Sequence, residues 1–304
     1  MNRRTFLKAA ALSVTAAPAW AIEPFGRPEP GPMKLALSAY SMRRHLTAAA
    51  GEPGAMDLIG FVDYCRDLGV PGAELTSYYF PDGFAVRPED EHRPDAAYVS
   101  GLKRRCHAAG VSVSGGAIRN DFCVPGDRLP AQIEHFRRWL DVYADLGAPA
   151  VRVFAGTVPK GSTEDEAVAR CAAALTQAGE LAAGRGVFAA VENHGGITAE
   201  ADTMLRIVRE ARGEWLGVNF DSGNFGVADP YAALAKIAPY AVNAQIKVEM
   251  KRPDGGKVPA DLERVVKVLR DAGYGGWVAL EYEGAEPPRD AVPRWLDVLR
   301  PLLT

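Results

Sequence analysis

Three carboxylates and one amide stand where short apolar stretches of the sequence end. They are Glu192, Asp221, Gln245 and Glu281, which close the apolar runs at 187–191, 218–220, 242–244 and 277–280. Runs of this kind are typical of parallel strands that are covered by helices on both faces, and such sheets place their chemistry at the carboxyl ends of the strands. Oxygen donors that meet there could bind a divalent cation, and carboxylates there could transfer protons.

A cation would resolve the repulsion between these carboxylates. Three carboxylates at close range would keep a proton unless a positive charge lies among them. All four side chains offer hard oxygen donors, which favour Mn²⁺ or Mg²⁺ over Zn²⁺. We therefore predict a divalent metal site formed by Glu192, Asp221, Gln245 and Glu281. The alternative is that these residues are helix caps or surface acids that happen to follow strands.

Strands and helices alternate along the chain in the order that would bring these four residues together. The predicted strands are 34–39, 72–75, 111–115, 150–154, 187–192, 216–221, 242–247 and 277–281. The predicted helices are 57–68, 95–109, 129–146, 163–185, 198–211, 230–238, 260–271 and 289–303. Eight such units in about 270 residues match an α/β protein with a single-domain (β/α)8 TIM barrel. An open doubly wound sheet is the alternative, but no G-x-G-x-x-G or Walker loop follows an early strand.

The first 21 residues resemble an export signal. Arg3 and Arg4 precede an apolar, alanine-rich segment that ends in Ala19-Trp20-Ala21, which predicts a twin-arginine signal peptide over residues 1–21. This segment is too short to span a membrane, so we expect no stable membrane anchor. The expected location is therefore the periplasm or the outside of the cell. The proline-rich stretch 22–32 is interpreted as a linker, and the barrel is expected to cover 33–304.

The net charge of the chain argues against nucleic acid as a partner, and the spacing of its cysteines argues against paired thiols. The 35 basic residues lose Arg3, Arg4 and Lys8 with the predicted signal, which leaves a net charge of −6 against 38 acidic residues. An acidic chain without a basic stripe is a poor partner for nucleic acid. The four cysteines form no C-x-x-C pair, so we expect buried free thiols.

Several segments resemble the sugar phosphate isomerase/epimerase family of xylose isomerase-like TIM barrels, which includes ketose 3-epimerases and inosose dehydratases. The segments are VENHGG at 191–196, NFDSGN at 219–224, QIK at 245–247 and ALE at 279–281, with support from AVRVF at 150–154. The resemblance covers the chain after the linker. It implies that Glu192, Asp221 and Glu281 are metal ligands, whereas Gln245 stands where the family usually has histidine. Asn224 stands where ketose epimerases often have a substrate-binding histidine.

The resemblance also implies a reaction. In that family, a metal stabilises the enediolate that forms when the carbon next to a carbonyl loses a proton, and two glutamates exchange this proton. This implies that Glu192 and Glu281 are the catalytic pair of a sugar isomerase or epimerase. A lyase or dehydratase that acts on 3-keto-sugars remains an alternative, as does a barrel that binds carbohydrate without catalysis. The expected partner is a small carbohydrate, and the sequence is compatible with a homo-oligomer.

Further residues near the expected strand ends could contact this substrate. His194 could bind substrate or orient Glu192, and Lys247 could neutralise an anionic intermediate or form a salt bridge. Arg152 could contact substrate, although pairing with a ligand carboxylate is the simpler interpretation. Tyr40 could form part of the wall of the mouth, where an aromatic face suits the apolar side of a sugar.

Overall fold

The computed structural model describes residues 22–27, 31–83, 87–90 and 93–304. The predicted signal peptide, residues 1–21, lies outside this part of the chain. Within the described ranges, no helix combines the length and the apolar character that a membrane crossing requires.

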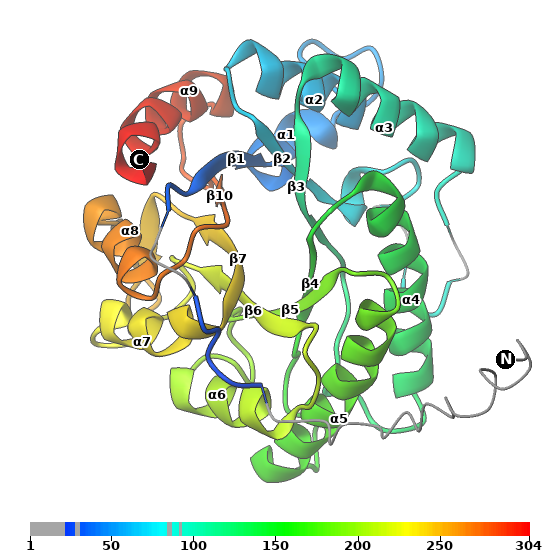
Figure 1. The fold of residues 1–304 in the computed structure, drawn as a ribbon, viewed down its shortest axis with the longest axis vertical. Helices are drawn as coiled ribbons and strands as arrows, with labels where there is room; N and C mark the ends of the chain where they lie inside the picture. Colours follow the sequence, from blue (N-terminus) through cyan, green and yellow to red (C-terminus); the bar gives the residue numbers. More distant parts are fainter. Residues whose placement is uncertain (1–21, 28–30, 84–86, 91–92) are drawn as a thin grey trace, which may run out of the picture.

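The described chain forms a closed barrel of eight parallel strands in the order β1-β10-β7-β6-β5-β4-β3-β2. Figure 1 looks down this barrel, with the strands on the inside and the helices around them. The strands are β1 (Lys34–Ser38), β2 (Gly72–Thr76), β3 (Ser112–Ala117), β4 (Ala150–Phe154), β5 (Phe188–Glu192), β6 (Leu216–Asp221), β7 (Ala241–Ile246) and β10 (Trp277–Leu280). The predicted single-domain (β/α)8 TIM barrel is therefore confirmed.

The helices that cover the barrel lie close to their predicted positions. They are α2 (Leu58–Asp67), α3 (Ala96–Ala109), α4 (Leu129–Leu146), α5 (Glu164–Ala183), α6 (Ala201–Glu210), α7 (Pro230–Ile237), α8 (Leu262–Asp271) and α9 (Pro288–Leu299). In α4, Phe136, Leu140 and Tyr143 lie at helical spacing and are buried against the barrel. Gly147 ends this helix in a left-handed conformation, with φ 83°, as expected for a glycine C-cap.

The structure also contains short elements that were not predicted from the sequence. The 3-10 helix η1 (Ala39–Met42) and helix α1 (Arg43–Leu46) follow β1, and η2 (Ser77–Tyr79) follows β2. An antiparallel hairpin, β8 (Glu249–Lys251) and β9 (Lys257–Pro259), stands between β7 and α8. The 3-10 helices η3 (Ala238–Tyr240) and η4 (Arg300–Leu303) follow α7 and α9.

Two predicted boundaries differ from the structure for identifiable reasons. Strand β3 continues to Ala117, because Gly116 packs under the ring of Tyr143 and does not end the strand. Helix α6 starts at Ala201, later than predicted, because the hydroxyl of Thr198 is used by the loop after β5. The cysteines of the described chain, Cys65, Cys106, Cys123 and Cys171, are free and buried, as expected.

The predicted linker packs against the barrel. Ile22 belongs to the hydrophobic core, and the ring of Phe25 lies edge-on against Phe188 at the start of β5. Arg27 donates to the carbonyl oxygen of Ala272 at 3.1 Å and also to that of Ala241. Residues 22–27 thus have no helix or strand, as expected, but they cover the amino-terminal ends of β5 and β7.

Gly116→Ala is expected to destabilise the barrel by about 1–3 kcal/mol, the usual cost of overpacking. A Cβ at this position would overlap the ring of Tyr143. That ring is fixed because the Tyr143 hydroxyl donates to the carbonyl oxygens of Leu75 at 2.9 Å and Ala117 at 3.1 Å. Urea unfolding measures the change, with Gly101→Ala as the control. Gly101 lies in α3 with open space around it, so alanine there should stabilise by up to about 1 kcal/mol. Equal stability of the two variants would contradict the packing described here.

Candidate active site

A cavity of about 260 Å³ lies at the carboxyl ends of the barrel strands. It brings together eight of the nine predicted site residues: Tyr40, Arg152, Glu192, His194, Asn224, Gln245, Lys247 and Glu281. The ninth, Asp221, is completely buried beside it and contacts Lys247. The volume suits a ligand about the size of one monosaccharide and is smaller than the pockets that bind drug-sized molecules.

Glu192, the last residue of β5, is held by a cation and an amide. Arg152 Nε lies 2.9 Å from Glu192 Oε2, and Asn224 Nδ2 donates to Glu192 Oε1 at 3.0 Å. Arg152 also donates to the carbonyl oxygen of Ile118 at 2.7 Å, so the guanidinium is fixed in place. Arg152 thus pairs with a carboxylate, as in the simpler of its two interpretations. Burial raises the pKa of Glu192 to about 8, and the nearby Arg152 opposes part of that rise.

The loop after β5 is fixed by side chains of the motif itself. Asn193 donates to the carbonyl oxygen of Asp221 at 2.9 Å and accepts from the Asp221 amide at 2.9 Å, which ties the ends of β5 and β6 together. Thr198 donates to the carbonyl oxygen of Glu192 at 3.1 Å. Gly196 has φ 54°, and a Cβ there would collide with the carbonyl of Gly156. The loop therefore presents Glu192 on a rigid frame.

His194 lines the cavity as a neutral ring. It lies against Phe154, with ring centroids 4.3 Å apart. Burial, helped by the positive charges of Arg152 and Lys247, lowers the pKa of His194 to about 3. A neutral imidazole can bind a substrate hydroxyl but cannot act as a positively charged acid near neutral pH.

Lys247 follows β7 and occupies the centre of a group of oxygen atoms. Its ammonium nitrogen lies 2.7 Å from Glu283 Oε1, 3.1 Å from Asp221 Oδ2 and 3.2 Å from Asn224 Oδ1. Burial alone would lower the pKa of Lys247, but the carboxylates around it raise the pKa well above its usual value. Lys247 is therefore a permanent cation, and its salt bridges are to Asp221 and Glu283. Sequence reasoning missed Glu283, although its spacing of two from Glu281 suggested a shared location.

Gln245 belongs to a closed ring of hydrogen bonds inside the barrel. Asn219 Nδ2 donates to Gln245 Oε1 at 2.6 Å, and Gln245 Nε2 donates to Glu74 Oε1 at 2.6 Å. Asn243 completes the ring by donating to Glu74 Oε2 at 2.9 Å and to Asn219 Oδ1 at 2.7 Å. Sequence reasoning missed Glu74, which lies within a short apolar strand and has no motif around it.

The carboxyl group of Glu281 faces the cavity without a hydrogen bond or ion pair to the described part of the chain. It lines the cavity, and within the described chain no hydrogen bond or ion pair involves its carboxyl oxygens. Burial raises the pKa of Glu281 well above its usual value, the nearby Lys247 opposes part of that rise, and the neighbouring carboxylates add to it. Glu281 is therefore suited to carry a proton, whereas Glu192 is paired with a guanidinium.

The predicted metal site does not fit this arrangement. Across the described ranges, no group of three or more His, Cys, Asp or Glu side chains is placed to hold a metal ion. Each predicted ligand except Glu281 already has a partner: Arg152 for Glu192, Lys247 for Asp221 and the hydrogen-bonded ring for Gln245. A divalent ion at Asp221 would also face the ammonium of Lys247. The described residues in this arrangement offer no Mn²⁺ or Mg²⁺ site, and no chemical step is derived through a metal.

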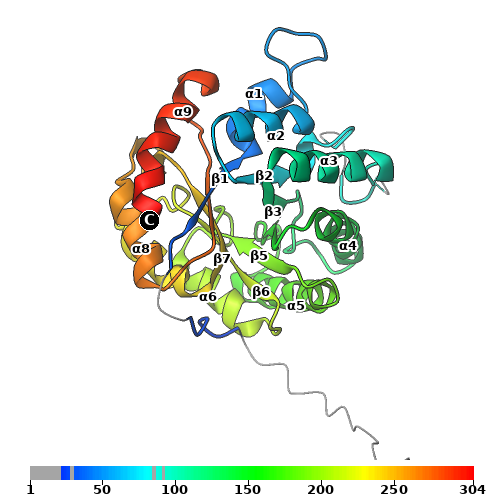
Figure 2. The same ribbon diagram turned by 45° about the horizontal axis from the view of Figure 1, so that its top comes forward.

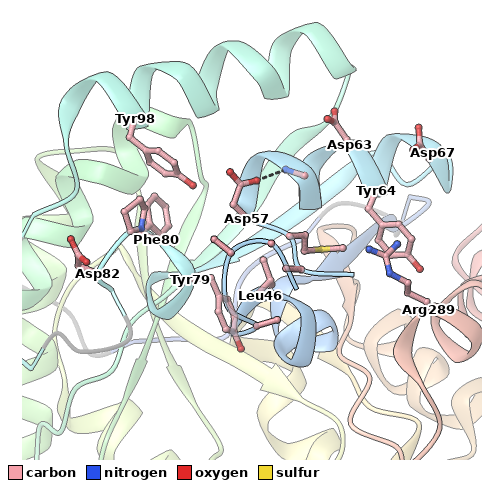
Figure 3. Close-up of a pocket in the computed structure, with 17 residues that line it drawn as sticks. Leu46, Asp57, Asp63, Tyr64, Asp67, Tyr79, Phe80, Asp82, Tyr98 and Arg289 are labelled. Atoms are coloured by element: carbon pink, nitrogen blue, oxygen red, sulfur yellow. Dashed lines mark hydrogen bonds between the residues drawn. The ribbon is translucent and has the colours of Figure 1, made fainter. Parts of the chain in front are cut away.

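A larger cavity of about 1110 Å³ lies outside the barrel, between the loop before α2, helices α2 and α3, and the turn after β2 (Figure 3). Figure 2 shows this loop, residues 47–57, projecting beyond the helices. Two acids of this cavity have structural partners: Asp57 accepts from the amide of Gly60 at 2.8 Å and caps α2, and Asp63 pairs with Arg105. The barrel mouth, where eight of the nine predicted residues meet, is therefore taken as the candidate active site.

Comparisons with known proteins agree with this fold. A family model described as xylose isomerase-like TIM barrel matches residues 62–302. The 3-keto-D-glucoside 4-epimerase YcjR of E. coli is similar in structure, with a TM-score of 0.66 and 16% identity over 88% of this chain and 99% of that one. The D-psicose 3-epimerase of Clostridium cellulolyticum H10, solved with D-tagatose, has a TM-score of 0.68 and 14% identity over 89% of this chain and 99% of that one.

A third similar structure is that of the IolI protein, which was solved with a bound zinc atom. Its TM-score is 0.68, with 15% identity over 89% of this chain and 96% of that one. At these identities the similarity shows a shared fold. No curated protein matches the sequence.

Proposed function

The chain belongs to the xylose isomerase-like TIM barrel family, and we propose that it is an isomerase or epimerase of a keto-sugar of about one ring in size. The observation that carries this proposal is the pair of glutamates on one small cavity. Glu192 is paired with Arg152, whereas Glu281 has no partner in the described chain. Carboxyl groups held in different environments are suited to opposite roles in proton transfer.

The proposed reaction moves one proton on the carbon next to the carbonyl. The Glu192 carboxylate removes the proton, and the electrons of the C–H bond form the carbon–carbon double bond of an enediolate, which leaves negative charge on the former carbonyl oxygen. The Glu281 carboxyl group then returns a proton to the opposite face and restores the carbonyl. Reactants and products have the same oxidation state, so the reaction needs no oxidant or reductant. The structural neighbours that act on psicose, tagatose and 3-keto-glucosides support a sugar as substrate.

The test is an NMR assay with a panel of free ketoses and 3-keto-glucosides. The proposal predicts a new stereoisomer or positional isomer from at least one substrate and no cleavage of the glycosidic bond. Release of the aglycone, or elimination of water, would identify a lyase on the same scaffold. Failure of every sugar to react, together with measurable binding, would favour a carbohydrate-binding barrel without catalysis.

The rate is expected to rise with pH as Glu192 ionises. Because the pKa of Glu192 is about 8, its proton-accepting carboxylate form predominates above that pH. The value of kcat/KM should therefore rise through about pH 8. Since Arg152 lowers the pKa of Glu192, Arg152→Gln should move the rising limb to higher pH by about 1–3 units.

The matched control for this pH profile is Arg128→Gln. Arg128 pairs with Glu89 on the surface, outside the cavity, so its loss should leave the profile unchanged. A rising limb that stays in place in Arg152→Gln would show that another group is the base.

A further inference from the structure

We propose that the ammonium group of Lys247 takes the place of a divalent metal ion in this barrel and stabilises the negative charge that develops on the substrate oxygen. The role of Lys247 in the reaction deepens the proposed function and rests on it. The statement that the site binds no divalent metal stands on the protein alone and can be tested without a substrate.

The segment where the family resemblance implied a metal ligand is built around Lys247. Four consecutive residues take part: Asp221, Ser222, Gly223 and Asn224. Asp221 and Asn224 contact the ammonium, at 3.1 Å and 3.2 Å. The hydroxyl of Ser222 accepts from the Lys247 amide at 2.8 Å. A Cβ at Gly223 would lie 2.6 Å from the carbonyl oxygen of Glu249 and 2.8 Å from the Lys247 side chain, so the glycine lets this segment approach both. Asp221, Ser222 and Asn224 therefore hold Lys247 in place.

Both polar atoms of the Gln245 side chain are engaged by other residues of the barrel interior. Its carbonyl oxygen accepts from Asn219, and its amide nitrogen donates to Glu74, which fixes the orientation of the amide in the barrel interior. The glutamine therefore completes a buried ring of hydrogen bonds where a metal ligand was expected.

The remaining charges are also compensated by the protein. Arg152 balances Glu192, and Asn224 connects the two ion pairs because it donates to Glu192 at 3.0 Å and accepts from Lys247 at 3.2 Å. The network runs without a break from Arg152 to Glu283. The three N–H donors of the Lys247 ammonium already face Glu283, Asp221 and Asn224, and the part of Lys247 that is not buried lines the cavity, so a substrate there would meet a cation held in place by these partners.

This position suits the reaction. The ammonium is fixed before the substrate arrives, and it faces the cavity in which the enediolate oxygen becomes negative. A preorganised donor in a site shielded from water is the main source of such stabilisation. Lys247 acts through its positive charge and keeps its proton, so the two glutamates still carry the transferred proton.

The test measures metal binding with Mn²⁺ as the probe. Purified full-length protein is analysed for metal content, and Mn²⁺ is then titrated with electron paramagnetic resonance as the readout. The proposal predicts far less than one metal per chain, no saturable Mn²⁺ site at micromolar concentration, and unchanged activity after dialysis against EDTA. One tightly bound metal per chain would overturn it, whatever the substrate proves to be.

A second experiment tests whether two substitutions can introduce metal binding. The double variant Gln245→His with Lys247→Met removes the ammonium and supplies an imidazole beside Glu192, Asp221 and Glu281. We expect it to bind Mn²⁺ at least about 100-fold more tightly than the wild type does. Gln245→His with Lys257→Met is the matched control, because Lys257 carries the same charge but does not line the cavity. Melting temperatures confirm that each variant is folded. Equal Mn²⁺ affinity of the double variant and its control would overturn the proposal.

Discussion

Glu281→Gln is expected to lower the rate of sugar interconversion by about 10²- to 10⁴-fold, the usual contribution of one proton-transfer group. The amide keeps the size of the side chain and removes its proton. Because the Glu281 carboxyl group has no partner in the described chain, the substitution breaks no hydrogen bond or ion pair, and the melting temperature should stay close to that of the wild type. The loss should therefore appear in kcat.

Hydrogen exchange makes this prediction specific. In Glu281→Gln, Glu192 can still remove a proton from one stereoisomer, so that stereoisomer should exchange hydrogen with D₂O without inversion. Glu192→Gln should show the mirror result, with exchange confined to the other stereoisomer. Glu249→Gln, outside the cavity, is the control and should keep the wild-type rate. Interconversion at the wild-type rate in Glu281→Gln would contradict the two-glutamate mechanism.

Lys247→Met is expected to lower kcat by about 10²- to 10³-fold, the usual loss when one preorganised donor to a developing oxyanion is removed. The methionine chain is similar in length and carries no charge. Steady-state kinetics on the best substrate of the panel measure the effect. If Lys247 served only to hold the loops in place, KM and stability would change more than kcat.

The same substitution leaves a buried carboxylate without its cation, which has a separate cost. Asp221 is completely buried, and losing one partner of a buried ion pair typically costs about 3–5 kcal/mol. Lys247→Met with Asp221→Asn removes both charges and should recover much of that stability. We expect this double variant to fold and to remain inactive. Recovery of activity together with stability would show that Lys247 has a structural role only.

The fold and the position of the site were predictable because they depend on local patterns. Glycine C-caps such as Gly147 and the apolar stripe of α4 mark where each helix packs and ends, and buried strands such as β5 end in polar groups. These features place Glu192, Lys247 and Glu281 at one mouth before any contact is known. The hairpin β8–β9 was missed because its strands are three residues each, too short to show a period.

The charge pairing inside the site was not predictable in the same way. Glu74 and Gln245 are 171 residues apart, and no spacing indicates that they share a hydrogen bond. The metal was expected because three carboxylates needed a cation. Both cations that meet this need, Arg152 and Lys247, were noticed in the sequence, but which carboxylate each one reaches depends on side-chain packing. Near Lys247 it also depends on Gly223, where a Cβ would meet both the Glu249 carbonyl oxygen and the Lys247 side chain.

The most direct test of the central claim is the position of deuterium in the product formed in D₂O by the EDTA-treated wild-type enzyme. If Glu192 and Glu281 transfer the proton with Lys247 as the stabilising cation, NMR should show one deuterium on the carbon next to the carbonyl, at the full rate. A product without deuterium, or a rate that returns only when a divalent metal is added back, would contradict it.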